Sequence, residues 1–231
     1  MIYNGVNLQD YNVAYMDESA FIAAPSRSYS EVTVAGRNGS LHYSNDRYDN
    51  LSVKVNCIIF NEIERYYGEL SAFLTKDTDY HRLEGFRRPD IFRMAAVKSI
   101  ATPTLRSFAR GGLFSITFDC KPLAYVKEGE EPIALTQSGI IHSEWIMPSK
   151  PFLRVYGWGT LQVGTGSLTI SSDVGEHVDI DCELKDAYVG ENNRNSFVTV
   201  QEWPELACGD NAVVLPSTVT RIEITPRWVT L

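Results

Sequence analysis

Three carboxylates on one stretch of sequence, HVDIDCEL, form the best candidate for a metal site. Asp179, Asp181 and Glu183 alternate with apolar residues, so in a strand all three would lie on one face. Carboxylate oxygens at this spacing could bind Ca²⁺. An acidic face turned to solvent explains the same pattern, and we favour that interpretation. We therefore assign no metal ligand.

A second cluster, in HRLEGFRRPDIFRM, is basic and aromatic. It contains Arg82, Arg87, Arg88, Arg93, Phe86 and Phe92. Clustered arginines can bind phosphate, but arginine and aromatic residues are also typical of protein interfaces. Residues 127–231 carry 7 Lys and Arg against 15 Asp and Glu, whereas residues 1–126 carry 14 of each. We predict no specific nucleic-acid binding and no docking on anionic lipid.

Motifs for covalent or cofactor chemistry are absent from the sequence. It has no Gly-x-Ser-x-Gly elbow, no phosphate-binding P-loop and no His-Glu-x-x-His helix. None of the histidines has a sequence-near partner of nucleophile or ligand type; they are His42, His81, His142 and His177. We predict that the protein is not an enzyme and requires no cofactor or metal.

Cysteine usage and hydropathy indicate a protein kept in a reducing compartment. Three of the four cysteines lie in apolar, strand-like runs, so buried free thiols are expected at Cys57, Cys120 and Cys182, with Cys208 outside such a run. No apolar run approaches about 18 residues, which argues against membrane insertion. The first residues, MIYNGVNLQDY, lack the pattern of a signal peptide.

Period-two alternation dominates the chain and predicts a mainly β protein. It is clearest in LSVKVNCII and LFSITFDC, and it returns in six runs after residue 150. Turn signals every 8 to 15 residues favour two β-sandwich-like domains. We place the first at residues 1–126, a linker and the start of the second at 127–150, and the remaining sandwich at 151–231.

One helix interrupts the strands, within residues 61–76. Its apolar stripe has helical spacing and consists of Ile63, Tyr66, Leu70, Phe73 and Leu74. Asn61 and Glu64 have the spacing of a capping box, so we expect Asn61 to cap the helix. We expect this single helix to pack on a sheet of the first domain.

The stretch TVAGRNGSLHYS predicts a β-hairpin, because Asn38-Gly39 is a strong signal for a two-residue turn. The expected cross-strand pairs are Arg37 with Ser40, Gly36 with Leu41, and Val34 with Tyr43. Polar sequence flanks the hairpin on both sides, so it has little apolar cover.

Taken in order, these segments resemble the distal tail protein (Dit) family of long-tailed, non-contractile bacteriophages. The resemblance begins with YNGVNLQDY and a Gly-Arg-x-Gly hairpin, carried by Gly36, Arg37 and Gly39, and continues in RRPDIFRMAAV. The second half contributes PFLRVYGWGTLQV, HVDIDCEL, AYVGENNRNSF, EWPELACGDNAV and RIEITPRWVTL. Pro226-Arg227-Trp228 is the most specific element.

The resemblance implies a structural protein of the virion, located at the tip of the phage tail after synthesis in the bacterial host cytoplasm. It implies a hexameric ring of N-terminal domains around a channel, with a galectin-like C-terminal sandwich on the periphery. Such a ring is a hub that joins the tail tube protein to the tail-associated fibre or lysin protein. Receptor-binding proteins are further partners in many relatives.

In such a ring, the hairpin would reach a neighbouring subunit and add its edge to that subunit's sheet. We predict a subunit interface at Gly36, Arg37, Asn38, Gly39 and Ser40. An ordinary solvated hairpin is the alternative.

A carbohydrate-binding module acting as a soluble adhesin is the rival function. The sequence lacks the His-Asn-Pro-Arg run of galectin sugar sites. Trp158 and Trp203 are the plausible stacking residues, and we expect structural roles for both. A head–tail connector or tube protein would share the ring but not the galectin-like second half.

Overall fold

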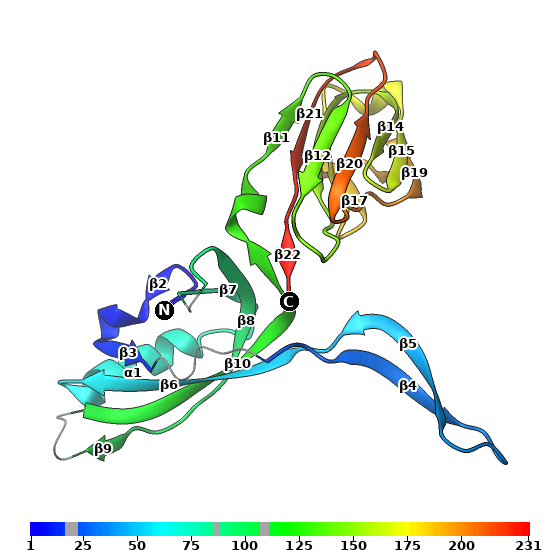
Figure 1. Ribbon diagram of the computed structural model, residues 1–231. Coiled ribbons are helices and arrows are strands. Elements are labelled where there is room, and N and C mark those ends of the chain that lie inside the picture. Colours follow the sequence, from blue (N-terminus) through cyan, green and yellow to red (C-terminus); the bar gives the residue numbers. More distant parts are fainter. Residues whose placement is uncertain (17–22, 86–87, 107–110) are drawn as a thin grey trace. The chain divides into compact units, whose positions relative to one another are not determined.

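The computed structural model describes residues 1–16, 23–85, 88–106 and 111–231. They form two compact units, Met1–Ala124 and Tyr125–Thr230, each built mainly of β-strands (Figure 1). The prediction of a mainly β protein is confirmed. The division proposed from the sequence, with its linker at 127–150, stays a proposal.

The main sheet of unit 1 has the strand order β2-β1-β7-β8-β10-β6-β3, and β9 also pairs with β10. Its strands are β1 Ile2–Tyr3, β2 Val6–Asn7, β3 Val13–Tyr15, β6 Leu51–Phe60, β7 His81–Glu84, β8 Ile91–Ile100, β9 Thr104–Arg106 and β10 Gly111–Val126. Strands β6 and β10 form an unbroken antiparallel ladder from Leu51–Cys120 to Phe60–Gly111. Their alternating apolar residues are buried on one face, as the period-two pattern predicts.

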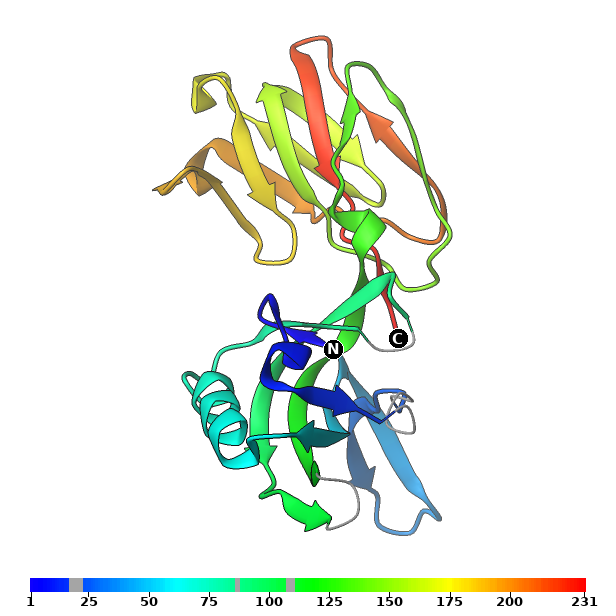
Figure 2. The ribbon, with the colours of Figure 1, turned by 90° about the vertical axis from the view of Figure 1, so that its left-hand side faces the viewer.

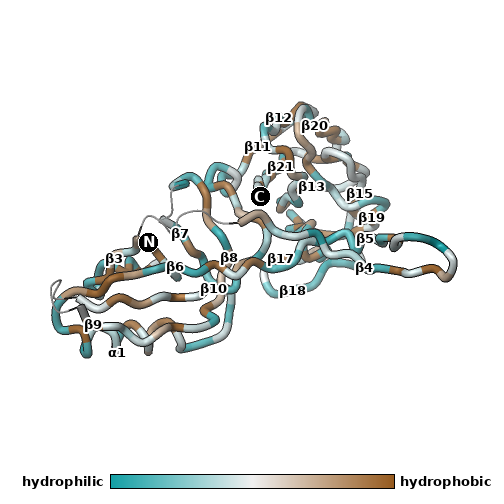
Figure 3. Tube along the Cα trace, turned by 60° about the horizontal axis from the view of Figure 1, so that its bottom comes forward, coloured by the Kyte–Doolittle hydropathy of each residue, from teal (hydrophilic) through white to brown (hydrophobic). Residues whose placement is uncertain are grey.

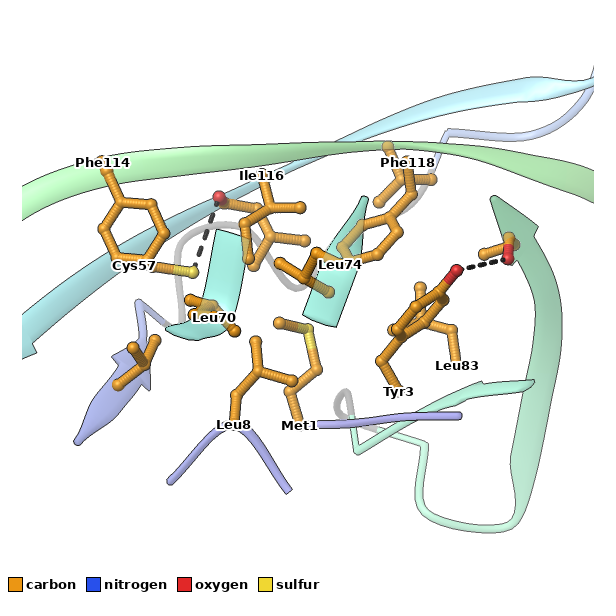
Figure 4. Close-up of a cluster of buried hydrophobic side chains, with 14 of the residues drawn as sticks. Met1, Tyr3, Leu8, Cys57, Leu70, Leu74, Leu83, Phe114, Ile116 and Phe118 are labelled. Carbon is orange, nitrogen blue, oxygen red and sulfur yellow. Dashed lines mark hydrogen bonds between the residues drawn. The ribbon is translucent and has the colours of Figure 1, made fainter. Parts of the chain in front are cut away.

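The helix α1, Ile63–Leu74, covers that face. Leu70 and Leu74 are fully enclosed, and Figure 4 shows them between Ile116 and Phe118 of β10 and the N-terminal segment. That segment includes the 3-10 helix η1, Leu8–Tyr11. The apolar stripe read from the sequence is therefore the packed side of the helix.

The predicted cap of this helix is wrong. Asn61 and Glu62 both have left-handed backbone conformations, with φ of 53° and 32°, and no side chain caps the helix. Because the chain turns at two successive residues, Glu62 rather than Asn61 precedes the first turn. Arg65 holds this turn by pairing with Glu62 at 3.0 Å and with Glu69 at 3.1 Å.

Unit 2 is a sandwich of two antiparallel sheets (Figure 2). The six-stranded sheet has the order β11-β21-β13-β16-β17-β18, and the five-stranded sheet has the order β12-β20-β14-β15-β19. Their strands are β11 Ile133–Leu135, β12 Gly139–Ser143, β13 Phe152–Gly157, β14 Gly159–Val163, β15 Gly166–Ile170, β16 Val178–Asp181, β17 Asp186–Val189, β18 Asn192–Asn193, β19 Val198–Glu202, β20 Gly209–Val214 and β21 Val219–Thr225.

The core of unit 2 lies between these sheets, with Leu153 and Ile224 buried on one and Leu161 and Leu168 on the other. Short 3-10 helices connect the strands: η3 Lys127–Glu130, η4 Ser172–Val174 and η5 Asn195–Phe197. The last strand, β22 Val229–Thr230, pairs with β10.

Replacing Gly68 with Ala should stabilise unit 1. Gly68 lies within α1, and a Cβ there would meet nothing within 4 Å. Alanine lowers the entropy of the unfolded chain and favours the helix, so we expect a gain of about 0.5–1 kcal/mol. The midpoint of chemical denaturation measures it. Gly112→Ala is the matched control and should destabilise, because its Cβ would lie 2.9 Å from Pro103. A lower midpoint for Gly68→Ala would contradict the packing described for α1.

Candidate assembly interface

Strands β4, Arg27–Thr33, and β5, Ser40–Tyr48, form a two-stranded sheet that pairs with no other described strand. We call residues 27–48 the arm (Figure 1). Nearly every residue of both strands is exposed. An isolated two-stranded sheet is only marginally stable in water, so the arm is the part of unit 1 that gains most from a partner.

The hairpin predicted here exists, but its predicted register is wrong. Thr33 pairs with Ser40 and Val32 with Leu41, which leaves residues 34–39 as the loop. Tyr43 consequently pairs with Ser30 rather than Val34.

Glycine at two positions explains the difference in register. The turn closes where the Arg37 amide donates to the Val34 carbonyl at 3.1 Å, with Gly36 at φ +79°. Gly39, at φ +82°, then returns the chain into β5. A type I′ turn needs positive φ at both central residues, and Asn38 is not among the residues with positive φ. The earlier glycine therefore sets the turn.

One face of the arm carries apolar side chains that are open to solvent. The register puts Val32, Leu41 and Tyr43 on this face, and they are 48%, 41% and 74% exposed. We call these three residues the apolar stripe. Figure 3 shows short hydrophobic segments near the outer end of the arm.

The opposite face of the arm is more polar. Tyr29 stacks on the His42 ring with 4.4 Å between centroids, and His42 lies 3.2 Å from Glu31. The two faces therefore differ in chemistry, as expected for a ribbon that docks on one side.

The predicted interface residues, Gly36 to Ser40, lie together at the exposed tip of the arm. That they contact another subunit stays a prediction. The apolar stripe was not among the predicted features, although its signal is present in the sequence: Val32 and Val34 alternate with polar residues before the turn, and Leu41 and Tyr43 do so after it. The wrong register hid their common face.

The acidic strand of unit 2 is not a solvent-facing surface, and that interpretation is wrong. Asp179 is 5% exposed and Asp181 is 4% exposed. Each carboxylate is held by a guanidinium group: Arg154 donates to Asp179 at 2.6 and 2.9 Å, and Arg227 to Asp181 at 2.9 and 2.8 Å. Buried charges are paired, and a sequence pattern cannot show their partners 25 and 46 residues away.

Asp181 accepts two further hydrogen bonds, from the backbone amides of Glu183 and Leu184 at 2.9 and 3.0 Å. Burial alone would raise the pKa of Asp181, but the hydrogen bonds from Arg227 and these amides hold that pKa below its usual value. Glu183 lies 4.0 Å from Arg227 and is half-exposed. Within the described ranges, no group of three or more His, Cys, Asp or Glu is arranged to hold a metal ion.

The segment Pro226-Arg227-Trp228 closes unit 2 on itself. The Arg227 amide donates to the Gly129 carbonyl at 2.8 Å, and the Val126 amide donates to the Trp228 carbonyl at 2.9 Å. The Ser149 hydroxyl donates to the Pro226 carbonyl at 2.8 Å. We call these bonds, together with the Arg227–Asp181 ion pair, the clasp.

Gly129 permits the clasp, because a Cβ there would lie 2.4 Å from the Trp228 nitrogen. Trp228 itself is buried.

The basic stretch is neutralised within unit 1. Arg82 contacts Glu84 at 2.5 Å, and Arg88 contacts Asp90 at 2.6 Å. Arg93 is buried and donates to the Pro122 carbonyl at 2.8 Å, and burial lowers the pKa of its guanidinium group. Phe86 and Arg87 lie outside the described residues. Arg82, Arg88 and Arg93 are thus each engaged by groups of this chain, and the absence of nucleic-acid binding stays a prediction.

The cysteines and the two candidate tryptophans differ in their exposure to solvent. Cys57, Cys120 and Cys182 are buried free thiols, as predicted, and burial raises the pKa of each to about 12. Cys208 is free and exposed. Trp158 is 47% exposed and Trp203 is partly buried.

Besides His42, two histidines have carboxylate partners: His81 lies 2.7 Å from Asp77, and His142 lies 2.6 Å from Asp210. Among the described residues, no helix is long and apolar enough to cross a membrane.

The fold is that of a phage hub protein. The chain superimposes on the crystal structure of the SPP1 Dit (gp 19.1) protein with a TM-score of 0.70 and 16% identity, covering 100% of this chain and 98% of that one. That protein is described as a paradigm of the hub adsorption apparatus in phages that infect Gram-positive bacteria. The resemblance seen in the sequence is thereby confirmed at the level of fold.

Two structures of the phage P2 baseplate in its activated conformation, with Ca and with Sr, are also similar. They match at 10% identity with TM-scores of 0.47 and 0.48, covering 95% of this chain and 92% and 91% of theirs, too distant to support an argument. No family model and no curated protein matches the sequence.

Replacing Asp181 with Asn should destabilise unit 2, because it leaves the Arg227 charge without its main partner. We expect a loss on the order of 3 kcal/mol at neutral pH, the lower end for a broken buried pair, since Arg227 keeps 28% of its side chain exposed. Chemical denaturation measures the loss. Glu183→Gln is the control and should have little effect, because Arg227 is 4.0 Å away and glutamine keeps an acceptor for the Tyr125 hydroxyl, which lies 3.4 Å away.

The pH dependence follows from the lowered pKa of Asp181. The ionised Asp181 carboxylate adds its full contribution to the free energy of unfolding above the ordinary pKa of 3.8. That contribution is lost as the pH falls through the lower pKa of the folded state. The wild-type protein and Asp181→Asn should therefore converge in stability as the medium is acidified. A difference that stays constant from neutral pH to strong acid would contradict the assigned pairing.

Proposed function

We propose that this protein is a structural component of a phage tail tip, a distal tail protein that serves as the hub of the adsorption apparatus. The observation that carries the proposal is the full-length likeness to the SPP1 Dit hub protein, at a TM-score of 0.70 over 100% of this chain. The protein that it matches over its full length is a structural hub protein rather than an enzyme, so we propose no catalytic activity.

The arm is the proposed contact between subunits. Its apolar stripe is exposed, and the outer backbone edges of β4 and β5 pair with no described strand. An exposed edge can add to a neighbour's sheet, and the stripe can bury itself against the same neighbour. A contact between two different surfaces of one chain is head-to-tail, and it generates rings when the rotation closes. We propose a homo-hexamer.

Arg37 is the proposed polar anchor of this contact. It lies at the exposed tip, and a guanidinium group can bind a carboxylate or two backbone carbonyls of a neighbour with paired hydrogen bonds. The surroundings of the loop are open, since a Cβ at Gly36 or Gly39 would meet nothing within 4 Å.

The proposed ring joins the tail tube protein to the tail-associated fibre or lysin protein and anchors host-adhesion proteins, with the chain located in the virion. Unit 2 would then be a galectin-like sandwich at the periphery.

The rival function is a soluble carbohydrate-binding adhesin. It does not explain the arm, because an adhesin that works as a single module does not need an exposed apolar hairpin. Light scattering separates the two: a hub protein forms large oligomers, and the adhesin stays small.

Replacing Tyr43 with Ser should weaken assembly. Tyr43 is the most exposed member of the stripe, and a tyrosine buried at an interface can contribute about 2 kcal/mol. We expect an association constant at least about thirtyfold lower, measured by light scattering over a concentration series. Tyr29→Ser is the matched control, a tyrosine of the same hairpin on the opposite face. Equal assembly of the two variants would show that the stripe does not dock.

Replacing Gly39 with Val should also reduce assembly, because it strains the backbone at the tip of the arm and removes no side chain. Gly39 has φ +82° with open space around it, and a β-branched residue tolerates this conformation poorly. Because the arm lies apart from the core of unit 1, the melting temperature of the chain should be nearly unchanged. If the variant still forms rings at the wild-type concentration, or if the monomer unfolds, the arm belongs to the subunit's own fold and the proposed interface is wrong.

A further inference from the structure

We propose that Asn38, in the loop at the tip of the arm, is a site of spontaneous deamidation. The reaction converts the amide side chain of Asn38 to a carboxylate, directly beside Arg37 in the sequence. It needs only water and groups of the loop itself, so the site exists whether or not the chain assembles into a ring. The same dipeptide occurs at two places in this chain, in two different structures, and this contrast supports the proposal.

An asparagine followed by glycine is prone to this reaction because the glycine has no Cβ to shield its nitrogen. That backbone nitrogen attacks the side-chain carbonyl carbon of the asparagine and forms a C–N bond, which closes a succinimide ring. The side-chain nitrogen leaves as ammonia and carries away the proton of the glycine amide. Water then opens the ring at one of its two carbonyl carbons, which gives aspartate or isoaspartate without any oxidant or reductant.

The first such dipeptide, Asn4-Gly5, is held in a tight turn. Asn4 and Gly5 have φ of 48° and 76°, the two positive values that a type I′ turn requires. Tyr3 pairs with Val6 across this turn, and the Asn4 amide donates to the Arg82 carbonyl at 2.9 Å. The succinimide ring can close only after the asparagine backbone rotates about ψ. Rotation at Asn4 would break these contacts, so the turn protects this residue.

The second dipeptide, Asn38-Gly39, lacks these restraints. Both residues are exposed, in the loop between the two strands of the arm. The hydrogen bond that closes the turn, from the Arg37 amide to the Val34 carbonyl, ends before Asn38. Among the described residues the Asn38 side chain has no hydrogen-bond partner, and a Cβ at Gly39 would meet nothing within 4 Å. The two groups that must meet are therefore free to rotate.

Deamidation adds a negative charge to the tip of the arm, and isoaspartate also adds a methylene group to its backbone. The consequence for assembly rests on the proposed function, in which Arg37 anchors a neighbouring subunit. A carboxylate at position 38 competes with that neighbour for the same guanidinium group. Asn38→Asp should therefore associate about fivefold more weakly than Asn38→Gln, measured by light scattering. Equal association of the two variants would overturn this consequence.

Peptide mapping by mass spectrometry tests the site itself, independently of assembly. The wild-type chain is diluted until light scattering shows a monomer and is kept in a mildly alkaline buffer, and the acid form of each asparagine is quantified over time. We expect Asn38 to deamidate first, at least about tenfold faster than Asn4, because Asn4 reacts only after local opening of its turn. Isoaspartate should be detected at position 38, and Asn38→Gln should form no acid there over the same period.

The wild-type chain in strong denaturant is the matched control. Neither dipeptide is then held by the fold, so Asn4 and Asn38 should react at similar rates. Equal rates in the folded chain would overturn the proposal, because the structure would then not distinguish the two sites. So would a rate for Asn38 that falls as far as the rate for Asn4 when the chain folds, because the loop would then protect Asn38 as the tight turn protects Asn4.

Discussion

The ion pair between Arg227 and Asp181 is the constraint on which the structure of unit 2 depends. It joins the last segment of the chain to β16 in the six-stranded sheet, and it does so at a residue with φ of 53°, which arginine seldom adopts. Beside it, the backbone bonds of the clasp hold the first residues of unit 2 against the last ones. The first and last residues of the sandwich are therefore fastened to each other.

The arm follows the opposite principle. In unit 2, the buried carboxylates of Asp179 and Asp181 are paired, whereas the arm leaves apolar groups exposed and a pair of strands without a further sheet partner among the described strands. Both arrangements cost free energy in the isolated chain, the first through desolvation and the second through exposed apolar surface. The desolvation is offset inside the chain, by Arg154 and Arg227. The exposure is not offset by any described strand of this chain, and this is why we propose the arm as a contact between subunits.

Much of the fold could be predicted from local pattern. The alternation in β6 and β10, the single helix with its stripe and the buried thiols all follow from apolar periodicity, because one face of each element must be buried. The register of the arm could not be predicted in the same way. Two glycines compete to form the turn, and the choice of Gly36 moves every cross-strand pair, so Leu41 and Tyr43 gain different partners.

The sequence by itself determined the class of protein, mainly β with an exposed hairpin, since periodicity and turn chemistry are local properties. Only the tertiary structure decided what the charged residues do. Asp179 and Asp181 have the spacing of a solvent-facing strand and are nevertheless buried, because Arg154 and Arg227 reach them from strands and turns far away in sequence. Burial of a charge depends on its partner in space, and the spacing of residues along a chain carries no record of that partner.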